Sequence, residues 1–179
     1  LELLDTEYID LYLVHAPPLD PSHRAPVWRA MEHCLEQGWV KSIGVSNYGE
    51  AHLDAMKKYA NYMPSVNQVE YNPWLQRPHL KKATEDSGAK IMAYSPLARG
   101  HRVDDPELGA IAERLGCTPA QVAIKFCYDQ GCITIPKSSN PSRIIENIAS
   151  LDIDISSEMD AITALDEDYV SGWDPTTEP

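Results

Sequence analysis

Five short apolar segments, each followed by a helix-like stretch, constrain the fold of this chain more than any other feature. We expect strands to begin at Ile9, Val40, Val66, Lys90 and Cys132. By subtraction, successive starts lie 31, 26, 24 and 42 residues apart. Each interval has room for a helical crossover and is too long for a two-residue hairpin. The pattern therefore predicts an α/β fold with a parallel sheet built from strand–helix units.

Repeated strand–helix units leave two architectures open, a doubly wound open sheet and a (β/α)8 barrel. Consecutive apolar residues, as in Tyr12-Leu13-Val14 and Ile91-Met92-Ala93, are typical of strands covered on both faces. No Gly-x-Gly-x-x-Gly follows any of the strands, which weighs against the dinucleotide-binding form of the open sheet. The sequence has no internal linker, so we expect residues 1–179 to form a single domain.

Proline, glycine and polar caps mark the expected helix ends. Asp105-Pro106 predicts a helix start, and Thr118-Pro119-Ala120-Gln121 has the pattern of a capping box. Gly38, Gly88 and Gly116 suit helix ends. With the periodicity of the apolar residues, these signals predict helices over residues 26–37, 50–60, 78–87, 106–115 and 119–130, from 141, and from about 157.

The acidic composition limits the partners of this chain. With 15 Lys and Arg against 27 Asp and Glu, the formal net charge is −12, so nucleic acid and anionic membranes are poor partners. No segment approaches the ~20 apolar residues of a membrane span, and we expect no signal peptide. The four cysteines show no paired spacing and the six histidines no metal-ligand spacing. We therefore expect free thiols, a cytoplasmic location and no metal.

Polar or aromatic side chains follow every expected strand, at the end where α/β proteins bind ligands. A single such group is usually a capped loop or a satisfied core residue. Five sets converging on one rim would be costly to bury unless a partner satisfied them. The residues at these strand ends are His15, Ser46, Asn47, Gln68, Tyr94, Ser95, Lys137 and Ser138.

Basic and hydroxyl side chains gather where the last expected strand meets the following helix. Lys137, Ser138 and Arg143 flank a helix start at Pro141. A helix N-terminus offers free backbone N–H groups and a partial positive charge, so it favours a phosphate. The lysine and arginine would add charge there. The alternative interpretation is a proline-started helix with two solvated basic residues.

The chemistry of these groups points to one kind of ligand. Ser46, Asn47 and Gln68 carry hydroxyl and amide groups suited to a carboxamide. Tyr94 offers a flat face on which a heteroaromatic ring can stack. Carboxamide, flat ring and phosphate together describe a nicotinamide dinucleotide. A phosphate held by both basic residues would favour NADPH over NADH.

Five segments of the chain have the character of motifs. They are Leu1-x-x-Leu4-x-x-x-Tyr8-Ile9-Asp10-Leu11-Tyr12-Leu13-Val14-His15, Gly44-Val45-Ser46-Asn47-Tyr48, Asn67-Gln68-Val69-Glu70-Tyr71-Asn72-Pro73, Ala93-Tyr94-Ser95-Pro96-Leu97 and Ile135-Pro136-Lys137-Ser138. In this order they resemble motifs of the aldo-keto reductase family, and the resemblance covers essentially the whole chain. It implies a (β/α)8 TIM barrel, of which the five strands would be the fourth to the eighth. It also implies NADPH-dependent reduction of aldehydes and ketones to alcohols.

The resemblance assigns a role to each residue that matches a motif. His15 would donate a hydrogen bond to the carbonyl of a small-molecule substrate. Ser46, Asn47 and Gln68 would hold the nicotinamide carboxamide, and Tyr94 would stack on the nicotinamide ring. Ser95 and Leu97 would line the pyrophosphate. Lys137, Ser138 and Arg143 would contact the 2′-phosphate, and Glu146 and Asn147 the adenine.

The chain departs from the family in its catalytic residues. The family uses a tyrosine acid, a lysine, an aspartate and a histidine, of which His15 is the one present; the other three precede the histidine strand. Three interpretations stay open. The sequence is part of a complete reductase with residues ahead of Leu1, or a truncated, catalytically inactive NADPH-binding or structural protein. In the third, a second copy or a partner completes the sheet by association through open strand edges.

Overall fold

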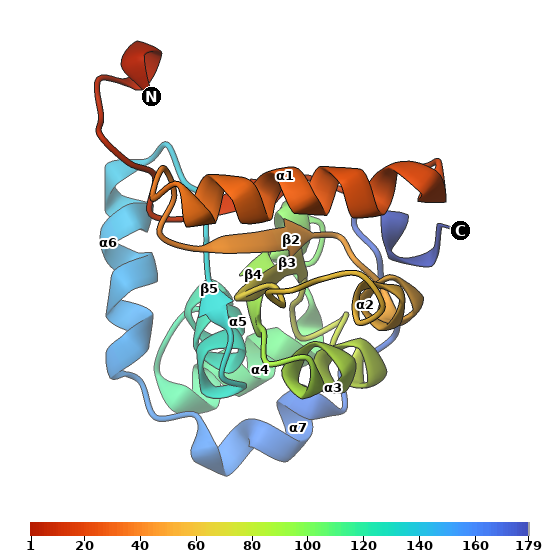
Figure 1. Cartoon of the computed structure of the whole chain (residues 1–179). Helices are drawn as coiled ribbons and strands as arrows, with labels where there is room; N and C mark the ends of the chain where they lie inside the picture. Colours follow the sequence, from red (N-terminus) through yellow and green to blue (C-terminus); the bar gives the residue numbers. More distant parts are fainter. Residues whose placement is uncertain (179) are drawn as a thin grey trace. The chain divides into compact units, whose positions relative to one another are not determined.

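Five parallel strands in chain order form the sheet, as the strand–helix pattern predicts. Figure 1 draws the chain coloured along its sequence and labels its helices and most of its strands. The computed structural model describes residues 1–178. Leu13 pairs with Gly44, Val45 with Asn67, and Ala93 with Thr134. The strands are β1 Tyr12–Val14, β2 Ile43–Ser46, β3 Val66–Glu70, β4 Lys90–Tyr94 and β5 Ile133–Thr134.

Helices follow the strands at the expected places. Asp105 caps α4 through its side chain, and Thr118 and Gln121 form the predicted capping box of α5. Gly116 ends α4 with a φ of +67°, a conformation that glycine adopts without steric cost. The helices are α1 Arg24–Glu36, α2 Glu50–Met56, α3 Pro78–Asp86, α4 Pro106–Leu115, α5 Pro119–Asp129, α6 Pro141–Ala149 and α7 Met159–Thr163.

The structure shortens several predicted elements. β1 begins at Tyr12 rather than Ile9, and Ile9 makes an isolated parallel bridge with Val40 instead. The second helix ends at Met56 rather than near residue 60, because the chain turns where Tyr59 and Ala60 donate back to Met56. Tertiary context sets these ends, since the apolar pattern continues through them.

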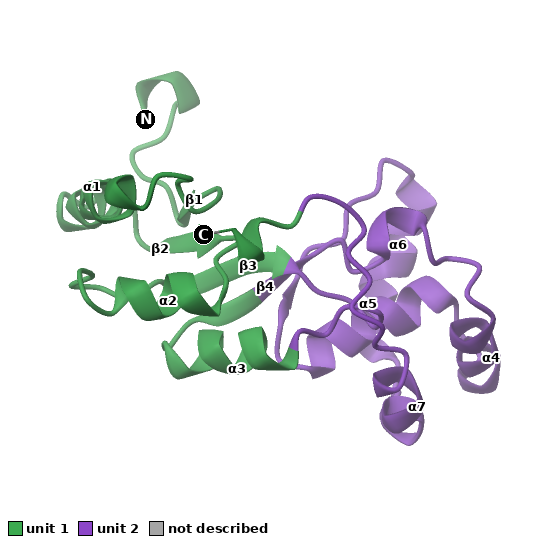
Figure 2. Cartoon of the chain, turned by 90° about the vertical axis from the view of Figure 1, so that its right-hand side faces the viewer, with its two compact units in different colours: residues 1–69, 78–91, 174–179 green, residues 70–77, 92–173 purple. Residues whose placement is uncertain are grey.

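The chain divides into two compact units, and each is built from separate stretches of sequence (Figure 2). Unit 1 comprises Leu1–Val69, Pro78–Ile91 and Asp174–Pro179, and unit 2 comprises Glu70–Arg77 and Met92–Trp173. Unit 1 therefore holds β1, β2, α1, α2 and α3, and unit 2 holds β5 and α4 to α7. β3 and β4 each pass from unit 1 into unit 2. A single domain over residues 1–179 stays a prediction.

In the core of unit 1, α1 packs against β2, and α2 packs against α3. Trp28 is buried, and its indole N–H donates to the carbonyl of Tyr62 over 3.0 Å. Glu32 is also buried, and its carboxylate accepts from the backbone N–H groups of Asn61 and Tyr62. A Cβ on Gly44 would lie 2.8 Å from the backbone carbonyl oxygen of Val66, so this strand position requires glycine.

The core of unit 2 lies around α5 and the segment after β3. Tyr71 stacks on Phe126 with ring centroids 6.3 Å apart. The side-chain amide of Gln76 donates to the carbonyls of Pro73 and Thr163, which fixes the C-terminal end of α7. Ser171 donates to the buried carboxylate of Glu70 through its backbone N–H and its hydroxyl. These bonds hold the segment 163–171 on the loop that follows β3.

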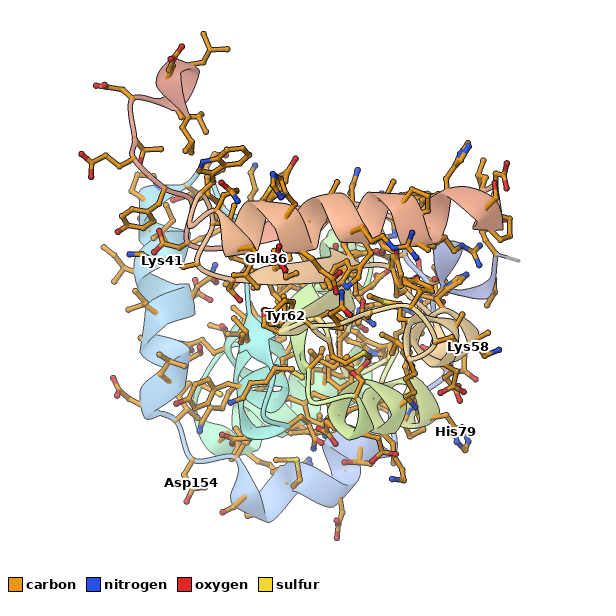
Figure 3. The ribbon with its side chains drawn as sticks, viewed as in Figure 1. Glu36, Lys41, Lys58, Tyr62, His79 and Asp154 are labelled. Carbon is orange, nitrogen blue, oxygen red and sulfur yellow. The ribbon has the colours of Figure 1, made fainter. Side chains whose placement is uncertain are left out.

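Charged side chains cover the surface, and one helix adds an apolar face. Lys58, His79 and Asp154 are exposed and project outward (Figure 3). The nine residues of α6 are all at least partly exposed, and three isoleucines, Ile144, Ile145 and Ile148, are 48%, 70% and 69% exposed. None of the helices within residues 1–178 has the length and apolar character that crossing a membrane requires.

The four cysteines are free thiols, as predicted. Cys127 and Cys132 are buried, and burial is the main cause that raises the pKa of Cys127 well above its ordinary value. Within residues 1–178, no group of three or more His, Cys, Asp or Glu side chains could hold a metal ion.

Candidate functional site

In unit 1, the ends of β1, β2 and β3 are joined by side-chain hydrogen bonds. His15 follows β1 directly and is exposed, and its backbone carbonyl accepts from the side-chain amide of Asn47 over 3.0 Å. The same amide nitrogen donates to the hydroxyl of Ser46 over 3.1 Å, and this hydroxyl donates to the carbonyl of Gln68 over 2.8 Å. The predicted carboxamide residues therefore lie together within unit 1.

Asn47 occupies an unusual backbone conformation. Its φ is +59°, in the left-handed region that asparagine enters more readily than most residues. Its N–H donates to the carbonyl of Gln68 over 2.8 Å, the last bond between these two strands. Ser46 and Asn47 are each 4% exposed. The turn thus fixes both side chains before any ligand arrives.

The sequence patterns miss a residue directly behind this turn. Asn67, on β3, accepts from the backbone N–H of Tyr48 over 3.3 Å and donates to the Tyr48 carbonyl over 2.8 Å. Asn67 and Tyr48 are both buried. The signal in the sequence is a polar residue between Val66 and Gln68 on an expected strand, but the functional interpretation rests on Gln68.

The start of α2 completes this part of unit 1. The backbone N–H of Gly49 donates to Nδ1 of His52 over 2.9 Å, so the neutral imidazole caps the helix. Burial, and secondarily the charge of Arg24, lower the pKa of His52. The backbone carbonyl of Glu178 acts in the opposite direction and raises this pKa. It is not within hydrogen-bonding geometry of the imidazole, and Nε2 of His52 has no hydrogen-bond partner within residues 1–178. Gly49 also touches the C-terminal segment, since a Cβ there would lie 1.9 Å from the Thr176 carbonyl oxygen.

In unit 2, the end of β4 repeats the left-handed turn. Tyr94 is the last residue of the strand, and Ser95 has a φ of +48°. The Ser95 carbonyl accepts from the side-chain amide of Asn72 over 3.3 Å and from the N–H of Ala98 over 2.9 Å. Leu97 follows and precedes a short turn of helix at residues 98–100. The aromatic residue and the predicted pyrophosphate residues thus lie on one ordered turn.

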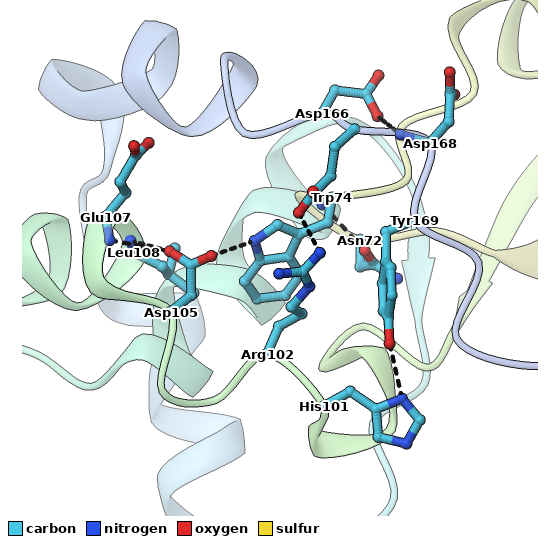
Figure 4. Close-up of polar contacts among 11 residues, drawn as sticks. Asn72, Trp74, His101, Arg102, Asp105, Glu107, Leu108, Asp166, Asp168 and Tyr169 are labelled. Atoms are coloured by element: carbon cyan, nitrogen blue, oxygen red, sulfur yellow. Dashed lines mark hydrogen bonds and ion pairs between the residues drawn. The ribbon is translucent and has the colours of Figure 1, made fainter.

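In the loop that follows β4, aromatic and charged side chains of unit 2 form hydrogen bonds and ion pairs with one another (Figure 4). The indole N–H of Trp74 donates to Asp105 over 3.1 Å, so this tryptophan is a core residue. Arg102 pairs with Glu167 over 2.6 Å and lies 4.3 Å from the ring centroid of Tyr169. These contacts join the loop after β4 to the C-terminal end of unit 2.

The predicted phosphate residues of unit 2 surround the start of α6. The side chain of Asn140 caps the helix by accepting from the N–H of Ser142, and the N–H of Asn140 donates to the Ser138 hydroxyl. Lys137 and Arg143 are exposed. A capped helix N-terminus beside two cations matches the donor chemistry that a phosphate requires.

The predicted adenine residues have bonds of their own within unit 2. The carboxylate of Glu146 accepts from the hydroxyl of Thr118 over 2.6 Å, and its carbonyl accepts from the side chain of Gln121. The carbonyl of Asn147 accepts from the Ser150 hydroxyl. Glu146 thus also ties α6 to the start of α5, and its role toward adenine stays a prediction.

Parallel strands with polar turns at their carboxyl ends define the class of α/β proteins that bind ligands at that edge. The residues of those turns narrow the class further. The chain belongs to the aldo/keto reductase family, whose family model matches residues 1–167. This confirms the resemblance that the five motifs predict.

Individual relatives support the same assignment. The chain is 40% identical to glyoxal reductase of Bacillus subtilis (strain 168) over 176 residues, covering 98% of this chain and 63% of that enzyme. Among solved structures, Gox0644 in its apo form is 35% identical, with a TM-score of 0.90 over 98% of this chain and 66% of that one. The Bombyx mori aldo-keto reductase AKR2E4 in complex with NADP is 31% identical, with a TM-score of 0.84 over 95% and 61%. The chain spans about three fifths of the length of the curated relatives it matches.

Proposed function

We propose that this chain carries the cofactor-binding residues and the carbonyl-facing histidine of an NADPH-dependent reductase of aldehydes and ketones. The observation that supports it best is the hydrogen-bonded set Ser46, Asn47 and Gln68 in unit 1, which carries the family's motif residues in a fixed arrangement. A relative that covers nearly the whole chain was solved in complex with NADP.

In unit 1, the amide and hydroxyl groups of Ser46, Asn47 and Gln68 would hold the nicotinamide carboxamide and orient the ring. His15 would donate a hydrogen bond to the substrate carbonyl. NADPH supplies a hydride when bound. Transfer of a hydride to a carbonyl requires a proton donor at the oxygen, and His15 is the one member of the family's catalytic set in this sequence.

In unit 2, Tyr94 would stack on the nicotinamide, and Ser95 and Leu97 would contact the pyrophosphate. Lys137 and Arg143, with the Ser138 hydroxyl, would bind the 2′-phosphate at the start of α6. The exposed positions of the two cations suit a group that arrives from solvent. Glu146 and Asn147 would contact the adenine.

A second candidate function is cofactor binding without turnover. It stays open because the predicted cofactor contacts do not depend on the tyrosine, lysine and aspartate of the family's catalytic set. In that case the chain would bind NADPH or serve as a structural partner and would reduce nothing.

Two measurements separate these functions. Quenching of NADPH fluorescence by the 179-residue chain tests binding, and loss of NADPH absorbance with an aromatic aldehyde tests turnover. In a form that turns over, His15→Ala should lower kcat by about 100-fold or more and leave NADPH affinity unchanged. Unchanged turnover would assign His15 a structural role, and absence of NADPH binding would overturn the cofactor-binding role in both candidates.

A further inference from the structure

The backbone of Tyr48 leaves the sheet of unit 1 and still has partners for both of its polar groups. The ladder between β2 and β3 ends at the bond from the Asn47 N–H to the Gln68 carbonyl. The positive φ of Asn47 then turns the chain away from β3. Tyr48 is 1% exposed, so water cannot satisfy its N–H and C=O, and leaving them unpaired would be costly.

Asn67 supplies both partners. A primary amide holds a donor and an acceptor in one plane, as a peptide group does. The two bonds of 3.3 and 2.8 Å to Tyr48 therefore act as one more rung of the ladder, made by a side chain. Successive residues of a strand point to opposite faces, so the side chains of Asn67 and Gln68 point to opposite faces of the sheet. Asn67 supports the turn from behind.

We propose that Asn67 is a positioning residue that holds Asn47 and Ser46 in the arrangement that binds the nicotinamide carboxamide of NADPH. A left-handed conformation is unfavourable for a residue other than glycine unless its surroundings fix it. Loss of the Asn67 bonds lets the turn relax. The Asn47 amide then shifts from the Ser46 hydroxyl and the His15 carbonyl, which it now contacts. This inference rests on the proposed function.

The test compares two probes on the 179-residue chain. NADPH has the nicotinamide, whereas adenosine 2′,5′-bisphosphate has the adenine and the 2′-phosphate without it. Asn67→Leu keeps the approximate size of the side chain but removes both the acceptor and the donor to Tyr48 without adding a charge. We expect NADPH affinity to fall about tenfold, the equivalent of about 1.4 kcal/mol, with the affinity for the bisphosphate unchanged.

Thr84→Val is the matched control, because the Thr84 hydroxyl is the other partner of the Asn67 amide nitrogen, at 3.4 Å. It removes a contact of Asn67 without touching Tyr48 and should leave NADPH affinity within about twofold. Thermal melting of each variant measures the fraction folded. If Asn67→Leu does not fold, Asn67→Ser is judged by the same two probes.

The outcomes separate the two proposals. A loss confined to NADPH supports the positioning role. Equal losses for both probes, or none for NADPH, overturn the positioning role alone. A wild-type chain that binds neither probe overturns the proposed function and this inference with it.

Discussion

In unit 1 the chain leaves β2 through Asn47, and in unit 2 it leaves β4 through Ser95; both residues have a positive φ. A fully buried asparagine braces each turn, Asn67 in unit 1 and Asn72 in unit 2. The two residues lie five positions apart in one family motif. The same backbone conformation is thus supported twice by the same residue type.

The surroundings of the two asparagines differ. Asn67 contacts neutral groups, the backbone of Tyr48 and the hydroxyl of Thr84. Asn72 has the buried carboxylate of Glu70 within 3.5 Å of its amide nitrogen, and its Oδ1 accepts from the N–H of Trp74. The turn in unit 1 therefore depends on neutral hydrogen bonds, and the turn in unit 2 depends on a buried charge as well.

The largest expected effect follows from that difference. Asn72→Asp would replace the amide donor with a second carboxylate beside Glu70, and two buried carboxylates repel. We expect a loss of about 3 kcal/mol in the free energy of unfolding, measured with urea. Asn67→Asp also buries a carboxyl group but has no carboxylate beside it, so its loss should be smaller, about 2 kcal/mol. Equal losses in the two variants would show that the neighbouring charge is irrelevant.

A second prediction concerns the C-terminal segment of unit 1. In Gly49→Ala, the added Cβ meets the Thr176 carbonyl at 1.9 Å, so residues 174–178 must move. We expect a loss of about 1–3 kcal/mol and faster proteolysis near the C-terminus. Gly109→Ala in α4 of unit 2 is the control, because a Cβ there meets nothing within 4 Å. It should stabilise the chain by up to about 1 kcal/mol. An intact tail in Gly49→Ala would contradict the contact.

A third prediction contrasts the exposed cations of unit 2 with the buried set of unit 1. Lys137→Ala should weaken NADPH about tenfold and leave NADH unchanged, because NADPH alone carries the 2′-phosphate. Added salt should reduce the difference, since Lys137 is exposed. Lys58→Ala, which removes an exposed lysine of unit 1, serves as the control. Equal loss for both nucleotides would refute the phosphate assignment.

The smallest expected effect is a change in pH dependence. The pKa of His52 in the folded chain lies below its ordinary value of 6.5, so the unfolded chain binds the proton first as pH falls. Stability is therefore greatest above about pH 6.5 and declines below it. His52→Gln keeps an acceptor for the Gly49 N–H and does not titrate. The difference between the melting temperatures at about pH 7 and about pH 5 should be smaller for His52→Gln than for the wild-type chain. An equal difference would show that His52 does not contribute to the pH dependence of stability.

Local signals predict much of this fold. The start of β4 and the start of α3 agree with the predictions, since Gly88 lies just before the strand and Pro78 marks the first residue of the helix. The capped starts of α4 and α5 agree for the same reason. Strand ends are harder to place, because pairing with neighbours ends before the apolar pattern does.

The candidate site is predictable in part. Motifs identify the residues at the strand ends, and the structure places Ser46, Asn47 and Gln68 together. Asn67 stands in one of the motifs, but its role is not predictable, because its partner Tyr48 lies 19 positions earlier in the sequence and no local pattern specifies that pairing. The contact of Gly49 with the C-terminal segment was equally hidden, since the φ of Gly49 is −84°, an ordinary value.

The interleaved sequence of the two units has a consequence for anyone who wants to study one alone. The polypeptide crosses between them four times, after Val69, Arg77, Ile91 and Trp173. No single cut in the chain releases either one intact, and a deletion that removes unit 2 also separates Val69 from Pro78 and Ile91 from Asp174. Neither unit can therefore be isolated by truncation, and each has to be studied by point substitution within the whole chain.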